Sequence, residues 1–159
     1  MLAYCLFCET QRCRQIAEHI SKNHKLACIS PVILQRKWVR GIPAEEAHDW
    51  LPGYLFLYSD VPLPDRFDVS GIIRILGNGP LTGQDLRFAE MIYQRNGVMG
   101  SVPLIQEGTR CRISDPAWAG LSGRVIRMDR ERKRCCIEYE FDGIPRTIWA
   151  GYEIIENEA

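Results

Sequence analysis

Near the middle of the N-terminal half, the sequence runs Trp50-Leu-Pro-Gly-Tyr-Leu-Phe-Leu-Tyr58. Its Pro-Gly pair favours a turn, and the unbroken apolar run after it predicts a strand buried on both faces. The neighbouring segments predict strands at residues 3–8, 28–40 and 72–76, helices at residues 10–23 and 82–94, a short helical segment at residues 62–70, and an exposed loop or hairpin tip at residues 41–49. This order predicts an α+β sandwich, in which helices pack on an antiparallel sheet.

The sequence changes character toward its C-terminal end. Polar and apolar residues alternate over short runs at residues 109–113, 123–128, 134–141 and 146–149, with Gly, Pro and Asp between the runs. Regularly spaced short strands of this kind predict a small, SH3-like β-barrel. Residues 97–107 contain two Gly and one Pro without a clear period, which is typical of a linker. We therefore expect a first domain at residues 1–96 and a second at residues 108–159.

Charge is balanced over the chain but not along it. The 159 residues include 20 Lys and Arg and 20 Asp and Glu. Overall neutrality argues against a protein that binds polyanions over its whole surface, which needs a surplus of cations. Six cations nevertheless fall within eleven residues, against only Asp129 and Glu131: Arg124, Arg127, Arg130, Arg132, Lys133 and Arg134. One face of the barrel is therefore expected to be cationic.

Two stretches together resemble the NusG family of bacterial transcription factors. Leu51-Pro-Gly-Tyr-Leu-Phe-Leu57 resembles the Pro-Gly-Tyr strand signature of its N-terminal NGN domain. Residues 107–129, which begin Glu107-Gly-Thr-Arg-Cys-Arg-Ile113, resemble a KOW motif, and residues 144–155 resemble the last KOW strands. With the strand and helix at the start and the helix after Thr82, the resemblance covers nearly the whole chain.

The resemblance implies a transcription elongation factor that catalyses no reaction. Its NGN-type domain would bind RNA polymerase at the clamp helices of the largest subunit, bridge the DNA channel and suppress pausing. Its KOW domain would contact a ribosomal protein, a termination factor or nascent RNA. The alternative is a ribosome-associated RNA-binding protein of the KOW type, against which the Leu51–Tyr54 signature argues.

Three departures from the family pattern favour a specialised, LoaP-like paralog that acts on particular operons as a processive antiterminator. Leu51 replaces the usual aromatic residue, Pro116-Ala-Trp118 replaces Gly-Pro-Phe, and 159 residues is short for a housekeeping member.

Polymerase-binding positions are implied by the same resemblance. Phe7 and Leu51, with Tyr54, would line an apolar pocket for the clamp helices, and the implied site comprises Phe7, Leu51, Pro52, Gly53 and Tyr54. Docking of a helix needs a few apolar anchors on a rigid sheet. The alternative is that Phe7 and Tyr54 are ordinary core residues, because successive strand residues face opposite sides and only one of Leu6 and Phe7 can face the core.

The basic segment at residues 124–134 is the candidate RNA-binding site. Guanidinium groups bind phosphate bidentately and stack on unpaired bases, both of which RNA hairpins display. Trp118 is predicted in a nearby turn, where it can stack on a base or cap the barrel core. The alternative for the arginines is a solvated turn. A second basic group, which is a candidate for contacts with DNA or merely an exposed face, comprises Arg12, Arg14, Arg36, Lys37 and Arg40.

Catalytic, cofactor and metal sites are not indicated. The three histidines lie in no nucleophile motif, and the glycine pattern has no phosphate loop. Cys5 and Cys8 form a CxxC pair without the second pair that a zinc site needs, so we expect buried structural thiols. The start of the sequence lacks signal-peptide features, and its apolar runs are too short to cross a bilayer. A cytoplasmic protein without cofactor, metal or membrane partner is therefore expected.

Overall fold

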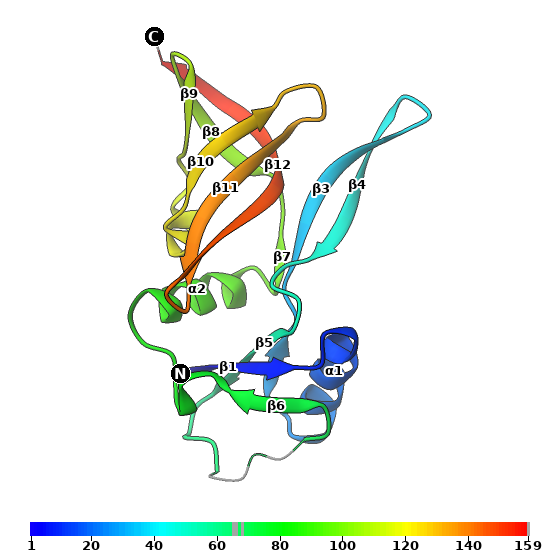
Figure 1. Ribbon diagram of the computed structural model, residues 1–159, viewed down its shortest axis with the longest axis vertical. Coiled ribbons are helices and arrows are strands. Elements are labelled where there is room, and N and C mark those ends of the chain that lie inside the picture. The colour runs from blue at the N-terminus through cyan, green and yellow to red at the C-terminus, as the bar shows by residue number, and fades with distance from the viewer. Residues whose placement is uncertain (65–66, 68, 159) are drawn as a thin grey trace. The chain divides into compact units, whose positions relative to one another are not determined.

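The computed structural model describes residues 1–64, 67 and 69–158 of the chain (Figure 1). By internal contacts these residues form two units, which comprise residues 1–31 with 49–97 and residues 32–48 with 98–159. Residues 32–48 thus group with the C-terminal residues, an association that the expected domain at residues 1–96 did not include.

The first unit is built on a four-stranded antiparallel sheet. Its strands follow the order β2-β5-β1-β6, with bounds Ala27–Ile29, Tyr54–Ser59, Leu2–Cys8 and Ile72–Ile75. Strand β5, which follows the Pro-Gly turn, occupies a central position because its side chains are apolar on both faces.

One helix covers each face of this sheet. Helix α1 (Cys13–Asn23) follows a 3-10 turn η1 (Thr10–Arg12), so the helix expected at residues 10–23 begins three residues later than predicted. The apolar stripe of α1 packs on Leu55 and Leu57 of β5. On the other face, α2 (Gly83–Gln94) places Phe88 against Phe56, with 5.8 Å between the ring centroids. Alternation along β5 therefore divides the core of the unit into two layers.

The helical segment expected at residues 62–70 is not formed by the residues of it that are described, 62–64, 67, 69 and 70. Residues 65, 66 and 68 lie outside the described residues. A 3-10 turn η2 (Leu76–Asn78) follows β6.

The second unit begins with a β-hairpin formed by β3 (Val32–Val39) and β4 (Ile42–Asp49). The residues between them, Arg40 and Gly41, have φ angles of 53° and 77°, as a two-residue hairpin turn of type I′ requires. The single strand expected at residues 28–40 is two strands, β2 and β3, with an interruption near Pro31. Most of residues 41–49, expected as a loop or hairpin tip, form β4.

The rest of the second unit is a five-stranded barrel-like sheet in the order β10-β11-β12-β8-β9. A 3-10 turn η3 (Pro116–Leu121) connects β9 to β10. The strands are β8 (Val102–Glu107), β9 (Arg110–Ile113), β10 (Arg124–Asp129), β11 (Arg134–Phe141) and β12 (Ile144–Glu158). The expected linker is thus largely strand, because β8 pairs in parallel with β12 and the short β7 (Val98–Met99) pairs with β3.

The fold class predicted from the sequence, an α+β sandwich with a small β-barrel, is confirmed. Among the described residues, no helix has the length and apolar character needed to cross a membrane.

Candidate functional site

A tight turn joins residue 50 to β5 and fixes the start of that strand beside the end of β1. Leu51 and Gly53 both have positive φ angles, 57° and 92°, and the Tyr54 N–H donates to the Leu51 carbonyl at 3.0 Å. The Cys8 N–H donates to the Gly53 carbonyl at 2.8 Å. Glycine suits position 53 because it adopts a positive φ at no steric cost.

The turn buries the side chain of Leu51. Its side chain is only 6% exposed, whereas Pro52 is exposed and Gly53 is buried. Leu51 is therefore a packing residue of the turn in this conformation. Substitution of Leu51 by a charged residue would disturb the fold as well as any contact, so it cannot test binding cleanly.

Phe7 and Tyr54 lie directly opposite each other on β1 and β5. Their rings meet edge to face, with centroids 5.2 Å apart, and both side chains are half-buried. Residue alternation puts this pair on the face that α2 covers, while Leu6 belongs to the core under α1. Leu6 and Phe7 therefore face different layers of the unit, and Phe7 is only half-buried.

Strand β6 adds Arg74, a residue that the sequence analysis missed. Arg74 pairs in register with Phe7, and its guanidinium carbon lies 5.6 Å from the centre of the Phe7 ring. No motif marks this arginine. Only the pairing of β6 with β1 brings it to the aromatic pair.

Three of the six clustered cations line one groove in the barrel. The groove has a volume of about 630 Å³ and lies between β9 and β10. Strand β10 contributes Arg124 and Arg127 to its lining, and Arg130 follows directly after that strand. Strand β9 contributes Arg110. Arg124 also pairs with Glu138, at 2.8 Å, so the charge of the groove rests mainly on the other three. Sequence reasoning missed Arg110 because it precedes the cluster by 14 positions.

The remaining three cations of the cluster lie elsewhere. Arg132 and Lys133 are exposed in the turn between β10 and β11, where the Arg132 N–H donates to the Asp129 carboxylate. Arg134 is half-buried, and one of its terminal nitrogens donates to the side-chain oxygen of Gln35 on β3, at 3.4 Å. The structure therefore does not bring all six together.

Trp118 is buried, with 2% of its side chain exposed, within η3. In this conformation the buried indole is not placed to stack on a nucleic-acid base, so a base contact would require it to leave the core. The other alternative, that Trp118 caps the barrel core, agrees with its burial and with that of Leu121 in the same turn.

The second basic group is mostly neutralised and is divided between the units. Arg12 pairs with Glu9 at 3.2 Å and Arg14 with Asp49 at 3.7 Å, both within the first unit. In the second unit, two further ion pairs of the group join Arg36 to Glu153 and Lys37 to Glu46. These pairs leave little local surplus of positive charge for DNA.

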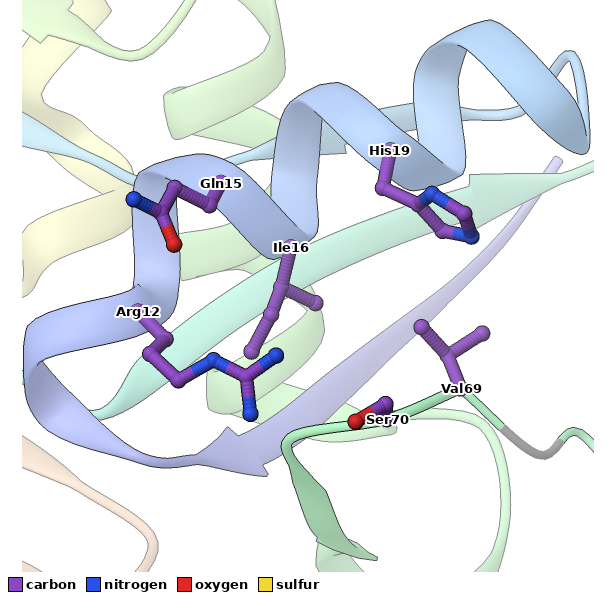
Figure 2. A pocket seen from close by; sticks show the side chains of 6 residues that line it. All are labelled: Arg12, Gln15, Ile16, His19, Val69 and Ser70. Atoms are coloured by element: carbon purple, nitrogen blue, oxygen red, sulfur yellow. The ribbon is translucent and has the colours of Figure 1, made fainter.

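A small cavity of about 250 Å³ lies between α1 and residues 69–70 (Figure 2). Ile16 and Val69 give it apolar walls, and Arg12, Gln15, His19 and Ser70 give it polar ones. Gly71 allows the close approach, because a Cβ at that position would lie 2.6 Å from the Ile16 Cδ1. Since Arg12 already pairs with Glu9, the cavity has little net charge.

The cysteines are free, and most of them are buried. Burial raises the pKa of the Cys8, Cys28 and Cys135 thiols to about 12, so they stay protonated at neutral pH. A thiolate is the form that binds metal or attacks an electrophile, so these groups are chemically inert. Within the part of the chain that the structure describes, no group of three or more His, Cys, Asp or Glu side chains is arranged to hold a metal ion.

Comparison with known proteins gives a likeness in structure alone. No protein-family model matches the sequence, and no curated protein matches it. A solved structure described as "Domain interaction in Thermotoga maritima NusG" is similar over 94% of this chain and 93% of its own, with a TM-score of 0.53 and 11% sequence identity. At that identity the likeness shows a NusG-like fold.

Proposed function

We propose that this protein is a transcription elongation factor of the NusG type. It binds RNA polymerase at the clamp helices of the largest subunit, suppresses pausing and promotes processive antitermination. It acts by binding in the cytoplasm and catalyses no reaction. The first unit, residues 1–31 and 49–97, makes the polymerase contact, and the barrel makes a second one.

The half-exposed pair of Phe7 and Tyr54, in a NusG-like fold, is the observation that carries this proposal. Aromatic side chains that keep exposed surface on a rigid sheet are suited to anchor an apolar helix. Backbone hydrogen bonds on both sides of β1 hold the pair in place, so little conformational entropy is lost on docking.

Nascent RNA is the second contact that the barrel supports best. Arg110, Arg127 and Arg130 give the groove a positive charge that suits phosphate groups. A protein partner would instead need apolar surface there. A ribosomal protein or a termination factor remains the other kind of barrel partner that the KOW resemblance implies.

A LoaP-like role on particular operons is part of the proposal. It rests on the departures at Leu51 and Pro116–Trp118. The alternative function, a ribosome-associated RNA-binding protein, also uses the arginine groove but assigns no role to the exposed surface of Phe7 and Tyr54.

Purification of the tagged full-length protein from native lysate separates these functions. We expect the core subunits of RNA polymerase to co-purify at near-stoichiometric amounts after nuclease treatment, because the contact is apolar and does not depend on RNA. Ribosomal subunits in their place would support the alternative, and recovery of neither would contradict both. Sequencing of RNA that co-purifies without nuclease would identify the operons.

Alanine at Arg110, Arg127 and Arg130 together is expected to weaken RNA binding more than about tenfold and to lower the salt slope by about two, since each phosphate contact to a single strand contributes about 0.7. The measurement is a titration of labelled RNA at several salt concentrations. Arg112→Ala is the matched control, because Arg112 lies on β9 outside the groove and pairs with Glu107. A triple variant with the wild-type slope would show that RNA does not use the groove.

A further inference from the structure

Arg74 is held at the edge of the aromatic pair by two features of the fold. Strand β6 is an edge strand of the sheet, and its register with β1 places Arg74 opposite Phe7. The guanidinium lies over the ring, 5.6 Å from its centre to the guanidinium carbon, a distance at which a cation is attracted to an aromatic face. The side chain is exposed.

The positive charge of Arg74 has no anionic partner among the described residues. No carboxylate of these residues forms an ion pair with it, whereas Arg12 and Arg14 of the same unit each have one. The contact with the Phe7 ring is to an aromatic face and not to a hydrogen-bond acceptor, so the guanidinium N–H groups can still donate to one.

We propose that Arg74 binds a carboxylate on the helix that docks on Phe7 and Tyr54. The proposal rests on the proposed function and narrows it: the partner helix carries an Asp or Glu close to its apolar anchor. Arginine suits this role because its planar fork matches a carboxylate, and stacking on Phe7 pre-orders it. Apolar contacts to the aromatic pair supply affinity, and the ion pair fixes the register of the helix.

A carboxylate fits this surface better than a phosphate does. Nucleic acid binds through several cations spaced along its backbone. The surface here offers one arginine beside Phe7, whose ring also meets that of Tyr54. An arginine beside aromatic side chains is typical of a protein–protein contact, where Arg and aromatic residues are enriched.

The test measures the affinity of the full-length protein for core RNA polymerase free of nucleic acid, at several salt concentrations. We expect Arg74→Gln to weaken binding about tenfold or more and to flatten its salt dependence. Arg74→Glu should weaken binding further, and Arg74→Lys should restore part of the affinity. Arg14→Gln, which removes an exposed arginine from α1 on the other face of the sheet, should leave both quantities unchanged.

The outcomes distinguish this inference from the proposed function. Wild-type protein that does not bind polymerase would contradict both. Tight wild-type binding with an unaffected Arg74→Gln variant would overturn the carboxylate contact alone. The proposed carboxylate contact is also contradicted if Arg74→Gln lowers the affinity for polymerase only when nucleic acid is present. The same holds if the variant lowers the affinity without changing its salt dependence. Circular dichroism of each variant confirms that the exposed substitutions leave the fold intact.

Discussion

Replacement of Phe7 by alanine is expected to weaken the binding of RNA polymerase about 100-fold or more, which is the effect of removing a strong interface anchor. Phe7 occupies the centre of the proposed docking surface, because Tyr54 and Arg74 both contact its ring. Its loss removes apolar surface and also releases Arg74 from its position. Tyr54→Ala should have a smaller effect in the same direction, since it removes only one of the two rings.

The measurement is a titration of labelled full-length protein with core polymerase, alongside thermal unfolding of each variant. Tyr93→Ala is the matched control. Tyr93 is a 40%-exposed aromatic residue on α2 that packs on Tyr58, and Tyr58 pairs with Ala3 at the other end of β1 from Phe7. If folded Phe7→Ala and Tyr54→Ala proteins bind as tightly as the wild type, this face of the sheet is not where polymerase docks.

Local patterns were enough to predict the central strand, both helices, strands β9, β10 and β11 of the barrel, and part of β12. They could not predict that the Leu51 side chain is buried. Its direction depends on the turn, in which Leu51 has a φ of 57° and the Cys8 N–H donates to the Gly53 carbonyl. Phe7 was ambiguous for a related reason. Both faces of its sheet are covered by helices, so alternation alone cannot say which face retains exposed surface.

Pairings between distant residues account for the elements that were missed. Residues 42–49 are polar and acidic, which is typical of a loop, yet they form a strand because a two-residue turn folds them back on β3. Strand β8 has no alternation to reveal it, because it is buried through parallel pairing with the end of β12, about 50 residues later.

The arginine cluster illustrates the same limit for a site. Nearness in sequence groups six cations, but the strands separate them: Arg127 and Arg130 line the groove, while Arg134 reaches Gln35 on the hairpin. Arg110 joins the groove only because β9 lies beside β10 in the barrel. Charge counts along a sequence thus predict that a cationic surface exists, and the strand order decides which residues form it.

Loss of the Trp118 side chain is expected to have a large effect on the stability of the barrel. With 2% of its side chain exposed, Trp118→Ala should destabilise the barrel by about 3–5 kcal/mol, the usual cost of truncating a buried tryptophan. Hydrogen exchange in β11 measures this directly, because that strand lies within the barrel sheet and reports its opening. RNA binding should fall only as far as the barrel unfolds.

The arginine variants and a conservative tryptophan variant separate stability from recognition. Trp118→Phe keeps most of the buried surface, so it should recover much of the stability and all of the RNA affinity of the folded barrel. Alanine at Arg110, Arg127 and Arg130, which are exposed, should do the reverse and lower RNA affinity at unchanged exchange rates. A Trp118→Ala barrel that exchanges as slowly as the wild type but no longer binds RNA would restore the base-stacking role, which would require the indole to leave the core in the complex.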